Sequence, residues 1–357
     1  MNAPRPPRLL FAATTSVFLR TFLLPFARHY RARGWAVEAL AAGATTDGDL
    51  ADAFDAVHEA SWGRQPLAPG NLDAARQVRA LVHRRGFDLV HVHTPVAAFV
   101  TRFALRDRAR GRPHIVYTAH GFHFHRGGGA LRNAAYAALE RLGARWTDDL
   151  VVINEEDERT ARTMRLLPAD RLHRMYGIGV DVAHYARSAV PAAAVAAVRT
   201  AIGLAPSDPM IVHVAEFTAN KRQLDLVEAL ARDPDGRWHA VFVGDGPLRA
   251  TVGARAAALG VAARTHFVGQ VRDPRPWMRA AAGVVLVSER EGLPRSVLEA
   301  MALEVPVIGT AIRGTGELLA EGRGHLVPVA DPAALATAIA AVLDAPGGAA
   351  RRALDAA

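Results

Sequence analysis

The chain has 357 residues, half of them hydrophobic, so it is long enough for about two globular domains that each bury a core. It contains no cysteine, which excludes disulfides, thiolate metal sites and a cysteine nucleophile, and which fits a reducing cytoplasm. The formal net charge of +8 favours partners that carry phosphate. The basic residues are spread along the chain rather than gathered in one block, so we expect no nucleic-acid partner.

Short apolar runs alternate with helical patterns through the first half of the chain. Residues 9–13 predict a buried strand, and residues 18–32 predict a helix that Pro25 kinks and Gly34 ends. No apolar run is long enough to span a bilayer. Strands that alternate with helices are typical of a parallel sheet covered on both faces. The alternation continues with predicted strands at 36–41, 88–91, 115–118 and 150–153 and predicted helices at 72–85, 97–106 and 130–142.

The same alternation restarts after residues 186–208, a segment rich in Ala, Pro and Ser that has no strand pattern. We therefore predict an N-terminal domain at 1–185, a linker at 186–207 and a C-terminal domain at 208–357. The pattern predicts an α/β fold of two Rossmann-like, doubly wound domains, in which ligands bind at the carboxyl ends of the strands. Predicted strands follow at 210–214, 239–243, 266–268, 283–287 and 305–309, and predicted helices at 222–231, 248–259, 296–303 and 332–343.

The run Ser-Glu-Arg-Glu-Gly-Leu-Pro-Arg-Ser-Val-Leu-Glu-Ala-Met at 288–301 follows an apolar strand and enters a helix. Glu291 lies in the turn, where a carboxylate can accept hydrogen bonds from sugar hydroxyls. The free backbone N–H groups at the helix N-terminus suit a diphosphate. Glu299 has two interpretations: it forms a capping box with Ser296, or it accepts hydrogen bonds from a ribose diol.

This run resembles the donor-binding signature of the retaining family-4 glycosyltransferases, in which two glutamates, here Glu291 and Glu299, are separated by seven residues. The resemblance extends over most of the chain. It implies a GT-B fold, in which an N-terminal acceptor-binding domain and a C-terminal nucleotide-sugar-binding domain face each other across a cleft. It also implies that Glu291 is a catalytic residue that holds the sugar. UDP is the expected nucleotide because members of the family commonly use it. The donor-binding residues that it implies are Gly292, Leu293, Pro294, Glu299, Gly244 and Gly269.

Lys221 is the only lysine of the chain and follows the first predicted strand of the second domain. The family has a basic residue there that contacts the donor diphosphate, so we expect Lys221 to be catalytic; the alternative is an exposed lysine at a helix N-terminus. The chain departs from the family at Glu216, where many members have an arginine. Either Arg222 or Arg272 supplies the second positive charge, or diphosphate binding depends on Lys221 and backbone N–H groups.

The run Tyr-Thr-Ala-His-Gly-Phe-His-Phe-His at 117–125 lies near His91 and His93 in the predicted sheet. So many histidines suggest a metal site, but no ligand-spacing motif is recognisable, and each imidazole can instead be packed or hydrogen-bonded. The run also resembles a subgroup of these transferases that builds bacterial surface polysaccharides, which implies that His120 lies beside the transferred sugar. We expect the acceptor to bind near Thr15, Ser16, His93 and Thr94.

We therefore expect a glycosyltransferase that moves a hexosyl or N-acetylhexosaminyl group without a metal or another cofactor, since we recognise no metal-binding Asp-x-Asp motif. Its acceptor would be a lipid-linked glycan precursor or a natural-product scaffold. The apolar side chains at 18–26 would serve a lipid-linked acceptor at the cytoplasmic membrane face, or they belong to a buried helix. A nucleotide-sugar epimerase of the same fold and a non-catalytic nucleotide-sugar-binding protein are the alternatives. The oligomeric state stays open.

Overall fold

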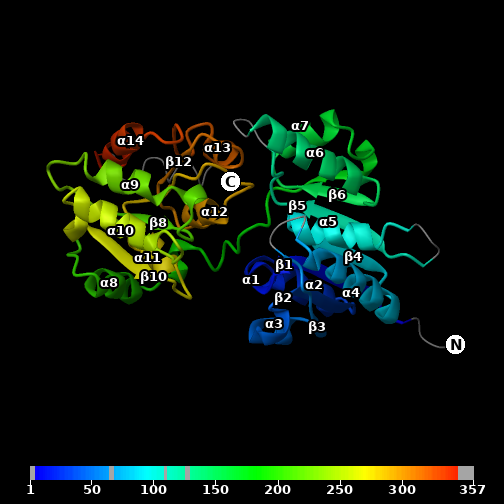
Figure 1. The fold of residues 1–357 in the computed structure, drawn as a ribbon. Coiled ribbons are helices and arrows are strands. Elements are labelled where there is room, and N and C mark those ends of the chain that lie inside the picture. The colour runs from blue at the N-terminus through cyan, green and yellow to red at the C-terminus, as the bar shows by residue number, and fades with distance from the viewer. Residues whose placement is uncertain (1–4, 64–67, 108–110, 125–128, 345–357) are drawn as a thin grey trace. The chain divides into compact units, whose positions relative to one another are not determined.

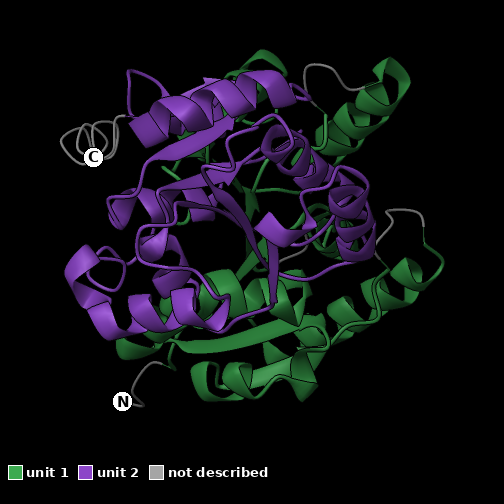
Figure 2. Cartoon of the chain, turned by 90° about the vertical axis from the view of Figure 1, so that its left-hand side faces the viewer, with its two compact units in different colours: residues 1–178 green, residues 179–357 purple. Residues whose placement is uncertain are grey.

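The computed structural model describes residues 5–63, 68–107, 111–124 and 129–344 (Figure 1). The chain divides into two compact units, residues 1–178 and residues 179–357 (Figure 2). Each unit contains one sheet whose strands pair in parallel, with seven strands in the first unit and six in the second. Parallel neighbours need crossover connections, which the helices between the strands supply. The predicted α/β fold with two Rossmann-like domains is confirmed.

The sheet of the first unit has the strand order β3-β2-β1-β4-β5-β6-β7. The order reverses beside β1, because the chain first winds outward through β2 and β3 and then returns to place β4 on the other side of β1. Its strands are β1 (Arg8–Thr15), β2 (Ala36–Ala42), β3 (Ala56–Glu59), β4 (Leu89–His93), β5 (His114–Ala119), β6 (Asp149–Val152) and β7 (Leu172–Arg174). After the N-terminal helical segment, its α-helices are α3 (Gly48–Ala53), α4 (Gly70–Arg85), α5 (Pro95–Ala104), α6 (Ala130–Ala144) and α7 (Glu155–Thr163).

The N-terminal helical segment differs from the single kinked helix predicted at 18–32. It consists of α1 (Ser16–Phe18), a π-helical turn (Leu19–Leu23) and α2 (Leu24–Ala32). Pro25 lies in the first turn of α2, where a missing N–H removes no hydrogen bond from that helix. The π turn buries two leucines in the core cluster that contains β1, and Phe18 and Phe22 pack against the same cluster. Two of the apolar side chains at 18–26 are thus buried, and Phe18, Phe22, Leu24 and Phe26 are half-buried.

The sheet of the second unit has the strand order β10-β9-β8-β11-β12-β13, and it reverses beside β8. Its strands are β8 (Met210–Val214), β9 (His239–Val243), β10 (Thr265–Gly269), β11 (Gly283–Leu286), β12 (Val307–Thr310) and β13 (His325–Val327). Its α-helices are α8 (Ala192–Ala201), α9 (Gln223–Leu230), α10 (Arg249–Ala258), α11 (Arg275–Ala280), α12 (Arg295–Ala302), α13 (Thr315–Leu319) and α14 (Pro332–Asp344).

The boundary between the units differs from the predicted linker at 186–207. The chain divides between Ile178 and Gly179, and the segment predicted as a linker packs within the second unit. Helix α8 of this segment packs against α11, and Arg199 donates a hydrogen bond of 2.7 Å to the carbonyl of Ala280. An alanine-rich helix can pack closely against its neighbour, so the composition that suggested a linker here forms part of a core.

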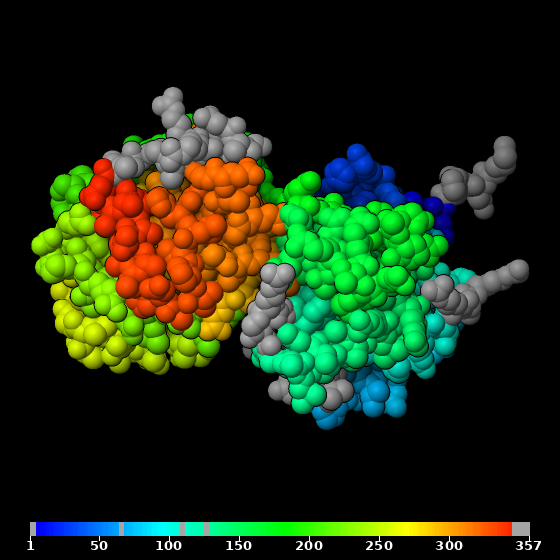
Figure 3. Space-filling model, turned by 90° about the horizontal axis from the view of Figure 1, so that it is seen from above, coloured from blue at the N-terminus to red at the C-terminus, as the bar shows by residue number. Residues whose placement is uncertain are grey.

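Apolar clusters cover both faces of each sheet, two clusters in each unit. The last described helix, α14, buries Leu335, Ile339 and Val342 and belongs to the red end of the surface seen in Figure 3. Within the described ranges, no helix combines the length and the hydropathy that crossing a bilayer requires.

Candidate functional site

The reversal of strand order marks one candidate site in each unit. In doubly wound sheets, ligands bind beyond the carboxyl ends of the strands at this point. In the first unit the reversal lies between β1 and β4, and in the second it lies between β8 and β11. Thr15 ends β1 and Ser16 begins α1, while Thr94, Lys221 and Glu291 lie in the segments that follow β4, β8 and β11. All five are sequence-predicted site residues.

In the second unit, the loop after β8 is tied to the loop after β11. The backbone N–H of Glu289 donates to the carbonyl of Asn220 at 2.8 Å, and the side-chain amide of Asn220 donates to the carbonyl of Arg290 at 3.0 Å. These bonds bring Lys221 Nζ within 2.5 Å of Glu291 Oε1. The two predicted catalytic residues of this unit therefore form an ion pair, with 24% of the lysine side chain and 13% of the glutamate side chain exposed.

Two glycines allow neighbouring loops to approach this pair closely. A Cβ on Gly314 would lie 2.0 Å from the carbonyl oxygen of Gly292, and a Cβ on Gly244 would lie 2.1 Å from that of Ala215. Gly314 also has φ +75°, a conformation that side-chain-bearing residues rarely adopt. The backbone N–H of Gly244 donates to the carbonyl of Gly269 at 2.8 Å. The structure thus brings the loops with Gly244, Gly269 and Gly292 to the same edge of the sheet as Lys221.

The run after β11 leads directly into α12. Leu293 is half-buried, and Pro294 is buried and precedes the first residue of the helix. No side chain caps α12, so the predicted capping box of Ser296 with Glu299 is wrong. Ser296 is the second residue of the helix, two positions after the N-cap residue Pro294, so it cannot cap the helix.

Glu299 is instead held by two residues that the capping interpretation did not involve. Its Oε1 accepts a hydrogen bond of 2.7 Å from the Tyr185 hydroxyl and lies 2.7 Å from Arg295 Nε. Burial raises the pKa of the Glu299 carboxyl, and the Tyr185 and Arg295 contacts oppose that rise. Both contacts use Oε1. Tyr185 was missed in the sequence because it is 114 residues away from Glu299 and belongs to no motif.

The two arginines considered for the diphosphate have different surroundings. Arg222 makes two hydrogen bonds to Asp225, at 2.7 and 2.9 Å, and one to Glu289 at 2.8 Å. These carboxylates raise the pKa of Arg222, with Asp225 the largest cause, and neutralise its charge. Arg272 is exposed and has no ion pair within the described part of the chain. The side chain of Glu216 is also exposed, so Arg272 is the arginine whose charge is available to a ligand.

His213 lies in β8 and was not singled out in the sequence. It is buried, and its ring packs against that of Phe242 with 5.9 Å between the centroids. Burial, followed by the positive charge of Lys221, lowers the pKa of His213 to about 4. The imidazole is therefore neutral at physiological pH and does not compete with Lys221 as a positive charge.

In the first unit, three histidines gather at the carboxyl ends of β4 and β5. His93 Nδ1 lies 3.0 Å from His120 Nε2, while His91 Nε2 lies 2.8 Å from the hydroxyl of Thr118. The ring of Phe18 meets His120 edge-on, with 4.9 Å between the centroids. Burial lowers the pKa of His120 to about 4 and the pKa of His93 well below its ordinary value. All three imidazoles are neutral at pH 7, since burial also lowers the pKa of His91 to about 3.

The hydrogen bond between His93 and His120 determines where their protons lie. One neutral ring must donate and the other accept. His93 Nε2 is buried and has no hydrogen-bond partner among the described residues. A buried N–H without an acceptor is rarer than an unmatched acceptor, so the network assigns the proton of His93 to Nδ1, which donates to His120 Nε2. His120 then carries its own proton on Nδ1.

The loop that carries His120 is held from α7. Asp157 is buried, and its carboxylate oxygens accept from the backbone N–H of Phe122 at 3.3 and 3.4 Å. Asn154 caps α7 by accepting from the backbone N–H of Asp157 at 2.8 Å. A buried carboxylate on a helix N-terminus thus anchors the turn that directly follows His120.

The residues predicted to bind the acceptor have distinct environments. Thr94 has φ +61°, and its hydroxyl donates to the carbonyl of His93 at 2.5 Å and also bonds to both the backbone N–H and the hydroxyl of Thr14. Its hydroxyl is therefore engaged within the protein. Thr15 and Ser16 are half-buried where β1 meets α1. His93 contacts His120, as described above, so the structure places it against the predicted catalytic histidine.

The histidine-rich run does not assemble a metal site in the described part of the chain. No group of three His, Asp or Glu side chains there is arranged to hold a metal ion. His123 packs against the ring of Tyr136, with 5.3 Å between the centroids. His125 lies outside the described residues.

Two protein families match the chain in succession. The family described as “Glycosyl transferase 4-like domain” matches residues 19–177, and the family described as “Glycosyl transferases group 1” matches residues 208–345. The two matches fall in the two units that the structure separates at residue 178.

Individual proteins match over most of the chain. EpsD of Bacillus subtilis (strain 168), which is assigned as a glycosyltransferase, is 33% identical over 335 residues, or 93% of this chain and 86% of EpsD. The UDP-Gal:alpha-D-GlcNAc-diphosphoundecaprenol alpha-1,3-galactosyltransferase of Escherichia coli is 27% identical over 274 residues, or 74% of this chain and 68% of that enzyme. The structure of Anabaena Alr3699/HepE in complex with UDP and glucose has the same fold, with a TM-score of 0.80 at 21% identity over 97% of this chain and 93% of that chain.

Proposed function

This chain belongs to the GT-B glycosyltransferases, and we propose that it transfers a sugar from a UDP-sugar to its acceptor with retention of the anomeric configuration. The observation that carries this proposal is the Lys221–Glu291 ion pair at the reversal of strand order, beside the N-terminus of α12. A lysine and a carboxylate held together there provide one group for a diphosphate and one for sugar hydroxyls. UDP is proposed because Anabaena HepE, which has this fold, was solved with UDP and glucose.

In this proposal the donor binds along the carboxyl edge of the second sheet. Lys221 and the exposed Arg272 contact the diphosphate, which lies against the loops that contain Gly244, Gly269 and Gly292. Glu299 accepts from the ribose through Oε2, because Tyr185 and Arg295 engage its other oxygen. Glu291 leaves the lysine and accepts from hydroxyls of the sugar.

The catalytic demand is electrostatic, because the leaving UDP gains negative charge as the glycosidic bond to its phosphate breaks. Lys221 stabilises that charge in the transition state. His120 donates its Nδ1 proton in a hydrogen bond to the sugar rather than acting as a base, because His93 occupies its Nε2. No step in this scheme requires a metal.

The proposed acceptor is a lipid-linked glycan precursor. The support is the match to an Escherichia coli enzyme whose acceptor is a diphosphoundecaprenol-linked sugar. The net charge of +8 would attract the protein to a membrane surface that contains anionic lipids. This attraction favours peripheral attachment at the membrane, where a lipid-linked acceptor lies.

A binding and turnover panel tests the proposed function. Calorimetry would compare UDP, GDP, UDP-glucose, UDP-N-acetylglucosamine and UDP-glucuronic acid, with and without EDTA, and NMR would identify the anomer of any product. We expect one UDP-sugar to bind tightly, insensitive to EDTA, and to give a product with the configuration of the donor. Binding without turnover in the presence of acceptors would indicate a nucleotide-sugar-binding protein, and an inverted product would contradict retention.

The assigned tautomer gives a further prediction for the first unit. The His93→Phe substitution replaces an aromatic ring by another in a cluster with Phe11 and Phe18, but it removes the donor to His120. We expect kcat to fall roughly two- to tenfold, since one hydrogen bond is worth ~0.5–1.5 kcal/mol. Nitrogen-15 NMR should show His120 protonated at Nδ1 in the wild type and partly at Nε2 in the variant.

The matched control is His91→Phe, which removes a neighbouring imidazole that bonds to Thr118 and not to His120. This control should keep the wild-type tautomer of His120. An unchanged His120 spectrum and unchanged kcat in His93→Phe would remove His93 from the proposed mechanism.

A further inference from the structure

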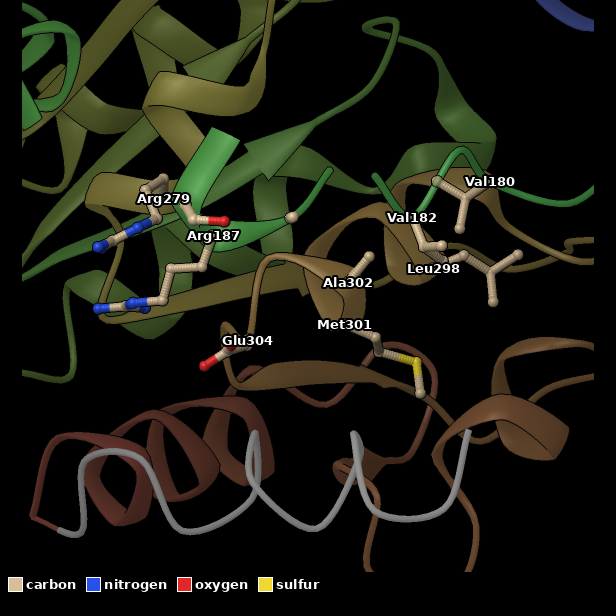
Figure 4. Close-up of a pocket in the computed structure, with 10 residues that line it drawn as sticks. Val180, Val182, Arg187, Arg279, Leu298, Met301, Ala302 and Glu304 are labelled. Atoms are coloured by element: carbon tan, nitrogen blue, oxygen red, sulfur yellow. The ribbon is translucent and has the colours of Figure 1, made fainter. Parts of the chain in front are cut away.

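The second unit contains a pocket that none of the proposed donor-binding residues lines. Its volume is ≈ 620 Å³, within the ~300–1,000 Å³ that small-molecule sites commonly have. The C-terminal half of α12, one side of α11 and the segment that opens the unit surround it (Figure 4). The residues lining it are Val180, Val182, Ala186, Arg187, Ser188, Arg279, Leu298, Met301, Ala302 and Glu304.

One part of the pocket is cationic. In Figure 4, the guanidinium groups of Arg187 and Arg279 extend to the same side, and the carboxylate of Glu304 lies on that side as well. Neither arginine has an ion pair within the described ranges, and Arg279 Nε is buried without a hydrogen-bond partner there. Burial and then the charge of Arg187 lower the pKa of Arg279, while Glu304 opposes them. Two arginines and one glutamate leave a net positive charge.

The other part of the pocket is apolar. Val180, Val182, Leu298 and Met301 lie together on the opposite side of the view in Figure 4. Val182 is 68% exposed, which is unusual for a valine beside a concave surface. A ligand that covered these side chains would gain hydrophobic free energy in proportion to the apolar area it removed from water.

The pocket is separate from the proposed donor site. The proposed donor residues near α12 either precede the helix or, in the case of Glu299, contact Tyr185. The pocket is instead lined by Leu298, Met301 and the residues that follow. Helix α12 has eight residues, or about 12 Å at ~1.5 Å per residue, and the two sites use different parts of it. A ligand here would therefore not need to compete with the nucleotide-sugar.

We propose that this pocket binds an amphiphile with a phosphate head and an apolar chain. Arg187 and Arg279 would each direct a guanidinium at the phosphate, and the Ser188 hydroxyl lies next to Arg187 as a further donor. A phosphate offers three terminal oxygens, enough for two guanidinium groups, whereas a carboxylate offers only two. The valines, Leu298 and Met301 would cover the first carbons of the chain. The proposal rests on the pocket and does not depend on the transfer reaction.

Calorimetry with decyl phosphate, below the concentration at which it forms micelles, tests this site on the full chain. We expect saturable binding of one molecule, at least tenfold tighter than inorganic phosphate or the uncharged amphiphile decyl maltoside. The double substitution Arg187→Gln with Arg279→Gln should weaken binding at least tenfold. The matched control is Arg232→Gln, an exposed arginine outside the pocket, which should leave binding unchanged.

Two further measurements separate this site from a general effect of charge or folding. Val182→Asp, at an exposed position, should weaken decyl phosphate binding while thermal melting stays at the wild-type temperature. Equal affinity of the arginine double variant, or equal weakening by Arg232→Gln, would overturn the proposal. Equal binding of inorganic phosphate or of decyl maltoside would do so too. A chain that bound decyl phosphate in this way but no UDP-sugar would contradict only the proposed transferase function.

Discussion

The Lys221→Ala variant is expected to lose roughly 10²–10³-fold in kcat, the range found when one preorganised donor to a developing negative charge is removed. Lys221 is the only lysine of the chain, and its Nζ lies at the reversal of the second sheet, 2.5 Å from Glu291. The effect should fall on kcat more than on KM, because the charge on UDP is greatest in the transition state. Steady-state kinetics with the preferred UDP-sugar measure it.

Two controls accompany the Lys221→Ala measurement. Removing the lysine leaves the half-buried Glu291 without its partner, so a thermal melt must show that the variant is folded at the assay temperature. Arg232→Gln removes one exposed positive charge of the same unit and should keep wild-type kcat. A folded Lys221→Ala variant with near-wild-type kcat would show that the leaving group is stabilised elsewhere.

The Glu291→Gln variant is expected to separate binding of the nucleotide from handling of the sugar. The carboxylate of Glu291 accepts a hydrogen bond from Lys221, so it competes with the diphosphate for the same ammonium. The glutamine amide is neutral, so it attracts the Lys221 ammonium less strongly than the carboxylate does. We therefore expect UDP to bind at least as tightly as it binds to the wild type, which calorimetry measures.

Transfer by Glu291→Gln should nevertheless fall by about 10- to 100-fold, since a hydrogen bond to a charged group is worth ~1.5–3 kcal/mol. The loss should appear with the complete UDP-sugar and be absent from UDP binding. Equal loss of affinity for UDP and for the UDP-sugar would indicate that Glu291 supports the loop after β11 rather than the sugar. Wild-type transfer would show that the sugar is held by other groups.

Much of the fold follows from local patterns in the chain. Buried strands such as β1 and β8 are short apolar runs, and their positions were predicted because both faces of a parallel strand are covered. The edge strands β3, with four residues, and β7 and β13, with three each, were missed. Edge strands bury less surface and carry weaker apolar patterns.

The sequence singled out residues of the candidate site where they share one motif or stand out by composition. Glu291 and Glu299 lie in a single run, and Lys221 stands out by composition. The contact of Tyr185 with Glu299 and the neutralisation of Arg222 by Glu289 join residues 114 and 67 positions apart. No local pattern encodes such pairs, because they form only when loops of different strands meet.

The amino-acid sequence by itself determined the alternation of strands and helices, the division into two Rossmann-like domains and the run to which we assign the proposed donor site. These features depend on periodicity and on short motifs, which act within one or two turns of chain. The tertiary structure decided that His93 contacts His120, that Lys221 pairs with Glu291, that residues 186–207 pack into the second unit and that Arg187 and Arg279 share a pocket. The physical reason is that burial, charge neutralisation and the tautomer of an imidazole are set by neighbours in space, which the parallel sheets bring together from distant parts of the chain.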